Sequence, residues 1–274
     1  MTIPALADRA DAAAQALLLR SPSPPAIAWY AEGGVGRLRT QALSTATVPA
    51  ARIDGLGPDL EGHFLWIPLG GSMVVAFEGG PLLSAGADAA IAALPIYALA
   101  RAGASVAVVT GGASSLEPAL EAPSLLIIED HIHLGGHSPL RPPIDPRLGP
   151  PFLDLANAYD PALLRAAEIR AAQAGVPARA GILATSPGPT LETDAERRFL
   201  RVAGAHAVGQ SIVAPVIAAR HAGLRVLALA GILEGVRRRG EFTDPARMAA
   251  TAGAVSEQTA QLIEALATDL CSSP

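Results

Sequence analysis

Short apolar runs alternate with longer amphipathic segments along most of the chain. Several runs carry no polar residue, which is typical of strands covered on both faces, whereas the amphipathic segments have helical spacing and end at Gly or Pro. This alternation predicts one α/β domain over residues 1–274, with an N-terminal helix and a Pro-rich linker in 1–24. Strands are expected at 26–30, 47–53, 63–69, 72–77, 104–110, 124–132, 181–185 and 224–232, with a brief strand and turn at 207–211, and helices at 4–20, 86–102, 160–174, 212–222 and 245–268.

The stretch Gly181–Glu196 combines a strand, a rigid loop and a helix. It reads G-I-L-A-T-S-P-G-P-T-L-E-T-D-A-E, and the Ser-Pro-Gly-Pro segment can neither continue a strand nor start a helix interior. Either Thr190 or Thr193 is expected to cap the helix that follows. The loop places Glu192 near a strand end, where α/β sheets bind ligands, and a carboxylate there can accept an N–H from a polar ring. The alternative is that Glu192 only interacts favourably with the helix dipole.

Other predicted strands also end in small or polar residues. Gly33, Gly111, Ser211 and Glu234 follow four of them, and 111–115 is expected to form a turn. If these ends share one edge of the sheet, they surround one pocket together with Glu192. Two neighbouring carboxylates, Glu192 and Glu234, should then have unequal pKa values, so that one can protonate a leaving heterocyclic base. Alternatively, Glu234 is a solvated strand end.

Composition and charge exclude several classes of protein. The net charge is −5, there is no lysine, and the only basic run is Arg237-Arg238-Arg239, so no nucleic-acid partner is expected. The single cysteine, Cys271, cannot form an internal disulfide, which fits a reducing cytoplasm. The N-terminus lacks the features of a signal peptide, and no unbroken apolar run reaches about 18 residues, so we expect a cytoplasmic protein without a membrane partner.

The histidines near residue 130 resemble a metal cluster by number. His131 and His133 would share one face of a strand, with Asp130 before them and His137 after them. No carboxylate pair or cysteine completes an obvious site, so a structural role is expected for Asp130 and His131, and no metal. The chain has no P-loop, no G-x-G-x-x-G after a strand and no G-x-S-x-G, so we expect no cofactor.

Several motifs together resemble the trimeric class of purine nucleoside phosphorylases, which includes the methylthioadenosine phosphorylases. The resemblance implies a three-layer αβα sandwich with a mixed central sheet of nine or ten strands, assembled as a homotrimer. It also implies phosphate-dependent cleavage of the N-glycosidic bond of purine nucleosides. The matching stretches are E-G-G-P-L (78–82), V-V-T-G-G-A-S-S-L (108–116), D-H-I-H-L (130–134), P-L-R (139–141), A-Y-D (158–160), G-P-T-L-E-T-D-A-E (188–196) and A-V-G-Q-S-I-V-A-P-V-I-A-A-R-H-A-G-L-R-V (207–226).

The resemblance also implies roles for individual residues. Glu192 matches the carboxylate that holds a purine ring N–H, and Glu234 stands where the family has an asparagine near purine N7. Phe77 matches an aromatic residue that packs on the sugar, and Phe152 matches one that a neighbouring subunit lends to the pocket. Gln210 replaces a methionine under the ribose. The implied substrate-binding positions are Phe77, Leu191, Gln210, Ser211, Phe152, Gly111 and Gly112.

The chain departs from this family at the positions that bind phosphate. The family uses a serine in the first Gly-rich loop and an arginine and a histidine on a later strand. Of its phosphate-binding side chains, only Ser211 remains. Losing two donors and gaining an acid should cost a bound dianion several kcal/mol, at about 1.5–3 kcal/mol per charged hydrogen bond. The altered positions are Glu32 and Gly33 in the loop, Met73 and Val75 on the strand, and Gly111-Gly112 in place of Asn-Ala.

These observations favour a diverged enzyme that cleaves or transfers at the N-glycosidic bond of a purine nucleoside, with 6-aminopurines preferred. Water or a substrate group would replace phosphate, so the enzyme would be a pentosyltransferase-like protein or a nucleoside hydrolase. Alternatively, Arg141 or a neighbouring subunit's arginine replaces the missing donors. Two further hypotheses stay open: an enzyme of a specialised pathway that uses paired acids for proton transfer on a non-nucleoside, and a non-catalytic ligand-binding trimer.

Overall fold

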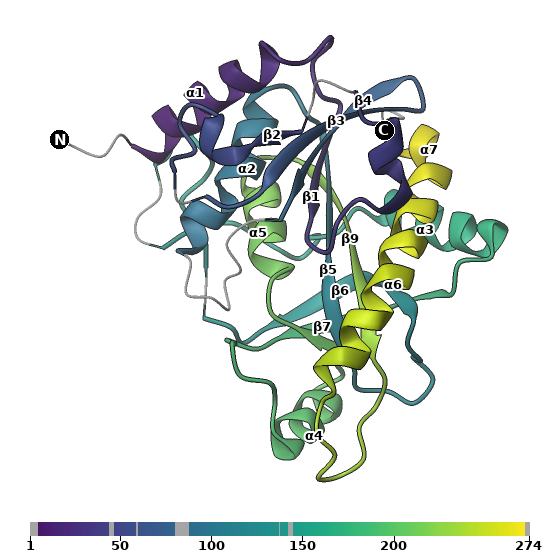
Figure 1. Cartoon of the computed structure of the whole chain (residues 1–274). Coiled ribbons are helices and arrows are strands. Elements are labelled where there is room, and N and C mark those ends of the chain that lie inside the picture. The colour runs from purple at the N-terminus through teal and green to yellow at the C-terminus, as the bar shows by residue number, and fades with distance from the viewer. Residues whose placement is uncertain are drawn as a thin grey trace.

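A mixed β-sheet forms the centre of the protein. The computed structural model describes residues 5–43, 47–58, 60–79, 88–136, 138–141 and 145–271. Within these residues the sheet has nine strands in the order β2-β3-β4-β1-β5-β8-β7-β6-β9 (Figure 1). The strands are β1 (Ile27–Ala31), β2 (Val48–Pro49), β3 (His63–Leu69), β4 (Ser72–Glu78), β5 (Val106–Ser115), β6 (Ser124–His133), β7 (Ala178–Thr185), β8 (Ala207–Gly209) and β9 (Arg225–Glu234).

Helices cover both faces of this sheet (Figure 1). Helices α1 (Leu6–Leu18), α2 (Ala89–Arg101) and α5 (Val213–His221) share one apolar cluster with the sheet. Helices α3 (Pro161–Ala174), α6 (Pro245–Ala265) and α7 (Ala267–Cys271) share a second cluster on the other face. The predicted three-layer αβα sandwich with a mixed central sheet is therefore confirmed. The short helix α4 (Asp194–Val202) lies at the lower end of the molecule in Figure 1.

The sheet closes on itself in its second half, which the sequence did not predict. Strand β5 pairs in parallel with both β1 and β9, and it pairs antiparallel with β8. Strands β5, β8, β7, β6 and β9 thus form a ring. The turn expected at 111–115 is wrong, because β5 continues through the glycines to Ser115. Small residues permit this crowding: a Cβ on Gly112 would lie 2.7 Å from Cδ1 of Leu233, and one on Gly209 would lie 2.8 Å from the Gly112 carbonyl oxygen.

Side-chain caps set the ends of most helices. Asp160 caps α3, which has Pro161 at its first turn and ends at left-handed Gly175. Of the two expected caps of α4, Thr193 is the one used, and it forms a capping box with Glu196.

Two predicted elements differ from the structure. The strand expected at 47–53 is confined to Val48–Pro49 and gives way to a 3₁₀ turn at Ala50–Arg52. The long C-terminal helix is divided into α6 and α7. His137 and the Pro81-Leu82 part of one family motif lie outside the described residues. No helix among the described residues is long and apolar enough to cross a membrane.

The approach of α6 to β9 depends on Gly231. A Cβ there would lie 2.0 Å from Cγ1 of Val255, so Gly231→Ala should lower the free energy of unfolding by about 1–3 kcal/mol through overpacking. Gly253→Ala, in α6 with no neighbouring atom within 4 Å of the added Cβ, should instead stabilise the protein by about 0.5–1 kcal/mol. Urea denaturation measures both effects, and equal stabilities of the two variants would contradict this packing.

Candidate active site

A cavity lies where the carboxyl ends of several strands meet. Glu32 follows β1, Gly112 and Ser114 belong to the last part of β5, and Ser211 follows β8. Because β1, β5 and β9 run parallel, their ends lie at one edge of the sheet. The predicted site residues that the structure brings together in the cavity wall are Glu32, Gly112, Leu191, Glu192, Gln210 and Ser211.

The other predicted residues lie outside this wall. Met73, Val75 and Phe77 are buried in the apolar cluster beneath α1 and α2, and Phe77 packs against Tyr30 and Phe64. Gly111 lies under the wall, where a Cβ would be 3.3 Å from Ser211 Oγ and 2.9 Å from Ile212 Cγ1. Gly33 is an exposed turn residue with a φ of +89°. The side chain of Phe152 is 92% exposed.

Glu32 and Ser211 form the polar end of the cavity. The Glu32 N–H donates to the Thr110 carbonyl oxygen at 3.1 Å, which fixes the residue against β5. Burial raises the pKa of the Glu32 carboxyl, and a hydrogen bond from Ser211 opposes part of that shift. Among the described residues, no arginine or histidine forms an ion pair with Glu32. This corner of the cavity therefore contains a carboxyl group whose charge is not offset by a cation.

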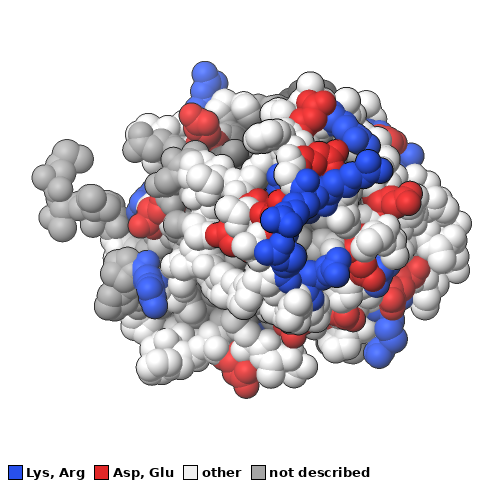
Figure 2. Space-filling model, turned by 90° about the horizontal axis from the view of Figure 1, so that it is seen from below, with Lys and Arg blue, Asp and Glu red and all other residues white. Residues whose placement is uncertain are grey.

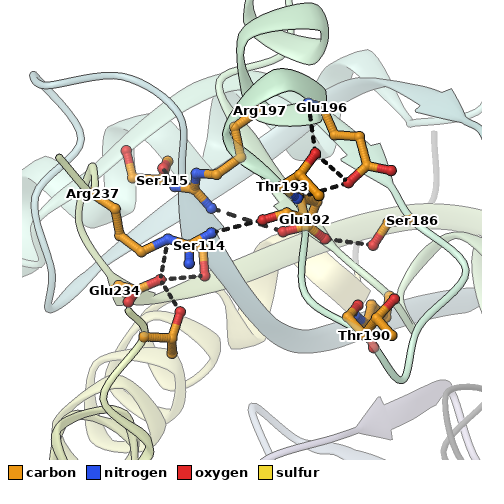
Figure 3. A network of polar contacts seen from close by, with 12 residues as sticks. Ser114, Ser115, Ser186, Thr190, Glu192, Thr193, Glu196, Arg197, Glu234 and Arg237 are labelled. Carbon is orange, nitrogen blue, oxygen red and sulfur yellow. Dashed lines mark hydrogen bonds and ion pairs between the residues drawn. The ribbon is translucent and has the colours of Figure 1, made fainter. Parts of the chain in front are cut away.

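Glu192 is held from several sides. Ser186 Oγ donates to Glu192 Oε1 at 2.5 Å, and Arg197 Nη1 lies 3.8 Å from Glu192 Oε2 (Figure 3). Arg237 Nη2 donates to the Glu192 carbonyl oxygen at 3.0 Å. Gln210 Nε2 donates to the carbonyl oxygen of Thr190 at 3.0 Å and thereby ties the loop to the end of β8. The Glu192 side chain is only 5% exposed, so these contacts fix one orientation of its carboxylate.

Glu234 lines an adjoining cavity that shares Leu233 and Met248 with the first. Its Oε2 accepts hydrogen bonds from Ser114 and Thr243, both at 3.3 Å, and lies 3.6 Å from Arg237 Nε. Ser114 lines the first cavity, so it connects Glu234 with that wall.

The two carboxylates do not form the isolated acid pair on which the sequence argument depended. Arg197 lies beside Glu192 and Arg237 beside Glu234, so positive charge offsets repulsion between the carboxylates (Figure 3). Burial lowers the pKa of Arg197, and the neighbouring charge of Arg237 lowers it further. Sequence reasoning missed both arginines: Arg237 belongs to a basic run that was weighed only as a sign of nucleic-acid binding, and nothing in the helix pattern marks Arg197 as buried.

The histidines of β6 have hydroxyl partners. His131 Nδ1 lies 2.9 Å from Tyr159 Oη, and His133 Nδ1 lies 3.0 Å from Thr185 Oγ1. Burial lowers the pKa of His131. No group of three metal-ligating side chains occurs among the described residues. The contacts agree with a structural role for His131.

Comparisons with known proteins identify the family. The chain matches the phosphorylase superfamily over residues 33–268. It is 33% identical over 226 residues to purine nucleoside phosphorylase 1 of Geobacillus stearothermophilus, covering 81% of this chain and 82% of the relative. The chain belongs to the purine nucleoside phosphorylase family. The corresponding enzyme of Bacillus subtilis is also 33% identical, over 238 residues that cover 83% of this chain and 88% of the relative.

The fold of this family member agrees with solved structures. The purine nucleoside phosphorylase of Schistosoma mansoni in complex with adenosine aligns with a TM-score of 0.85 and 25% identity. The alignment covers 94% of this chain and 96% of the other. A second structure, a schistosoma purine nucleoside phosphorylase in complex with hypoxanthine, aligns with the same TM-score and identity. The expected family and fold are therefore confirmed.

Arg197 is predicted to be a structural support of this site. Arg197→Gln removes its donor to the Ser115 carbonyl oxygen, at 2.6 Å, and leaves buried Glu192 without its nearest cation. Breaking such a buried pair should lower the free energy of unfolding by about 3 kcal/mol or more. The adjacent Arg198 is exposed, and Arg198→Gln should change it by less than about 0.5 kcal/mol. Equal urea midpoints for the two variants would contradict the assignment.

Proposed function

We propose that this protein cleaves the N-glycosidic bond of a purine nucleoside with water as the nucleophile, without using inorganic phosphate. Family membership supports a purine nucleoside as the substrate class, since the relatives named above are purine nucleoside phosphorylases. The absence of phosphate from this proposal rests on the Glu32 carboxyl beside Ser211 in the strand-end cavity, which forms no ion pair with any described residue.

The cavity wall offers a purine ring a fixed acceptor. Glu192 is oriented by Ser186 and Arg197, so its carboxylate can accept an N–H on the N1 side of the base, from the ring in inosine or from the 6-amino group in adenosine, without first being ordered. Glu234 is proposed to face the side of the base that carries a 6-amino group, because Ser114 links it to the cavity wall. A carboxylate accepts from an amino group but not from a carbonyl oxygen, which favours adenine-type over guanine-type bases.

Phosphate would meet an unfavourable environment at the other end of the cavity. A dianion near Ser211 would approach the Glu32 carboxyl, and Met73 and Val75 contribute only buried apolar side chains to a different region. Arg141, which the sequence left as a substitute donor, is exposed and does not line this cavity. Each charged hydrogen bond that the dianion lacks costs it about 1.5–3 kcal/mol.

Glu32 is the proposed general base. Its ionised carboxylate takes a proton from water, whose oxygen bonds to the anomeric carbon while the bond to the base nitrogen breaks. The electron pair of that bond leaves with the base, which takes up a proton from solvent. Because burial raises the pKa of Glu32, its carboxylate is a stronger base than an exposed one. The Ser211 hydroxyl positions the water.

The first test is base release from adenosine and inosine, with and without phosphate. We expect free base and free ribose to form at the same rate in both conditions, with adenosine the better substrate. Glu32→Gln should lower kcat by about 10²–10⁴-fold, whereas Glu129→Gln, an exposed carboxylate on β6, should leave it unchanged. Base release that requires phosphate and saturates with it would contradict the proposal.

The pH profile gives a second test. Glu32 must be ionised to act as a base, and burial raises its pKa. The ordinary pKa of a glutamate is about 4.3. The kcat/KM of the native protein should therefore fall as the pH drops through a midpoint that lies above this value. The residual activity of Glu32→Gln should lack this acidic limb. A limb that persists in the variant would assign the titration to another group.

A homotrimer is also proposed, on the basis of the family resemblance and of Phe152, whose exposed ring is available to a neighbouring subunit. Light scattering should then give three times the chain mass of 27.8 kDa, and a monomer mass would contradict it. Cytoplasmic location stays a prediction from the single cysteine.

A further inference from the structure

A separate cavity beside the active site is lined mainly by arginines. It lies between α4 and the segment that follows β9, with a volume of about 140 Å³, several times that of one water molecule. Figure 2 shows arginine side chains gathered around a hollow on this end of the molecule. The concentration is unusual in a chain with a net charge of −5. The charged lining residues are Asp194, Arg197, Arg198, Arg201, Arg237 and Arg239.

The charges in this cavity are not balanced. Arg197 and Arg237 are offset by Glu192 and Glu234, which belong to the neighbouring cavities. The other three lining arginines form no hydrogen bond or ion pair through their side chains with any described residue. Asp194 opposes one of them, although its Oδ2 already accepts the Gly240 N–H at 3.0 Å. The wall therefore has an excess of two positive charges.

We propose that this cavity binds a phosphate-type dianion. Guanidinium groups present planar pairs of N–H donors that match phosphate oxygens, and the excess charge of the wall equals that of a dianion. The mutual repulsion of Arg197 and Arg237, which contributes to the lowered pKa of Arg197, would be relieved by such a ligand. The ligand is either free orthophosphate or the phosphate group of a monoester, since both present the same oxygens.

This site is distinct from the proposed nucleoside cavity. The two cavities share no lining residue, and they are connected through Arg197 and Arg237, which contact Glu192 from the arginine side. The inference does not depend on the proposed reaction.

Calorimetric titration of the whole protein with sodium phosphate at low ionic strength tests the site. We expect saturable binding to one site per chain, weakened by salt. The triple variant Arg198→Gln, Arg201→Gln, Arg239→Gln should weaken it by about a thousandfold or more, at about tenfold or more for each of the three lost charged hydrogen bonds. These residues are exposed, so the urea midpoint should not fall. Arg238→Gln, beside Arg239 but outside the cavity wall, should bind as the native protein does.

The outcomes separate this inference from the proposed reaction. Phosphate binding that survives in the triple variant but is lost in Ser211→Ala would overturn this inference and the phosphate-free reaction together. If phosphate binding is lost in the triple variant but retained in Ser211→Ala, the arginine site is supported, whatever the reaction proves to be. Unsaturable binding, or binding of heparin without binding of phosphate, would overturn it.

A parallel titration with ribose 5-phosphate distinguishes the two sources of the anion. Binding tighter than that of orthophosphate, and equally sensitive to the triple variant, supports the arginine site and indicates a phosphate monoester. If ribose 5-phosphate binds more weakly than orthophosphate, and the triple variant weakens orthophosphate binding, the arginine site is supported and its ligand is the free ion.

Discussion

The parallel pairing of β5 with β1 and β9 determines where this protein can bind a ligand, because it brings three strand ends to one edge. The close crossing of β5, β8 and β9 then closes the sheet into a ring. Glycines at 112 and 209 permit this approach, since a Cβ at either of them would meet an atom of a neighbouring strand within 3 Å. The cavity and its polar residues follow from that crossing.

Charge compensation differs between the two ends of the cavity. At the end with Glu192, buried arginines offset each carboxylate, and hydroxyl donors orient both of them. At the end with Glu32, the Ser211 hydroxyl hydrogen-bonds the carboxyl, and no cation among the described residues counters the effect of burial on its pKa. A buried charge without a partner is costly, so the second end favours a neutral ligand or a proton over a dianion. The proposed use of water depends on this asymmetry.

The apolar and polar pattern of the sequence was sufficient for the layers and for most elements, because strand and helix periodicities are local properties. This pattern could not predict that β5, β8, β7, β6 and β9 close into a ring. The expected turn at 111–115 is part of β5, and only the packing of Leu233 and of β8 shows why small residues continue a strand there. The rule that ligands bind at the ends of parallel strands predicts that Glu32 and Ser114 lie in the cavity wall. Glu192 follows β7, which is parallel to β8 and therefore antiparallel to β5, so this rule does not predict its position. The closure of the sheet into a ring brings Glu192 to the cavity.

Prediction of the site was limited by the same non-local contacts. Glu192, Gln210 and Ser211 were found because a specific motif surrounds each of them. Arg197 and Arg237 were not, because helical spacing does not show which arginine turns inward toward a carboxylate. Phe77 does not line the cavity and is fully buried against Phe64, and this contact between β3 and β4 cannot be predicted from either segment alone.

The central claim is that the partly buried Glu32 carboxyl has no neighbouring cation among the described residues, and NMR tests this through the pKa of that carboxyl. A pH titration of the glutamate side-chain carbon signals, with Glu32→Gln to assign the resonance, should show one carboxyl whose pKa lies clearly above the ordinary value of about 4.3. A Glu32 signal that titrates at or below that value would mean that a positive group shares the cavity, and the account of its chemistry would be wrong.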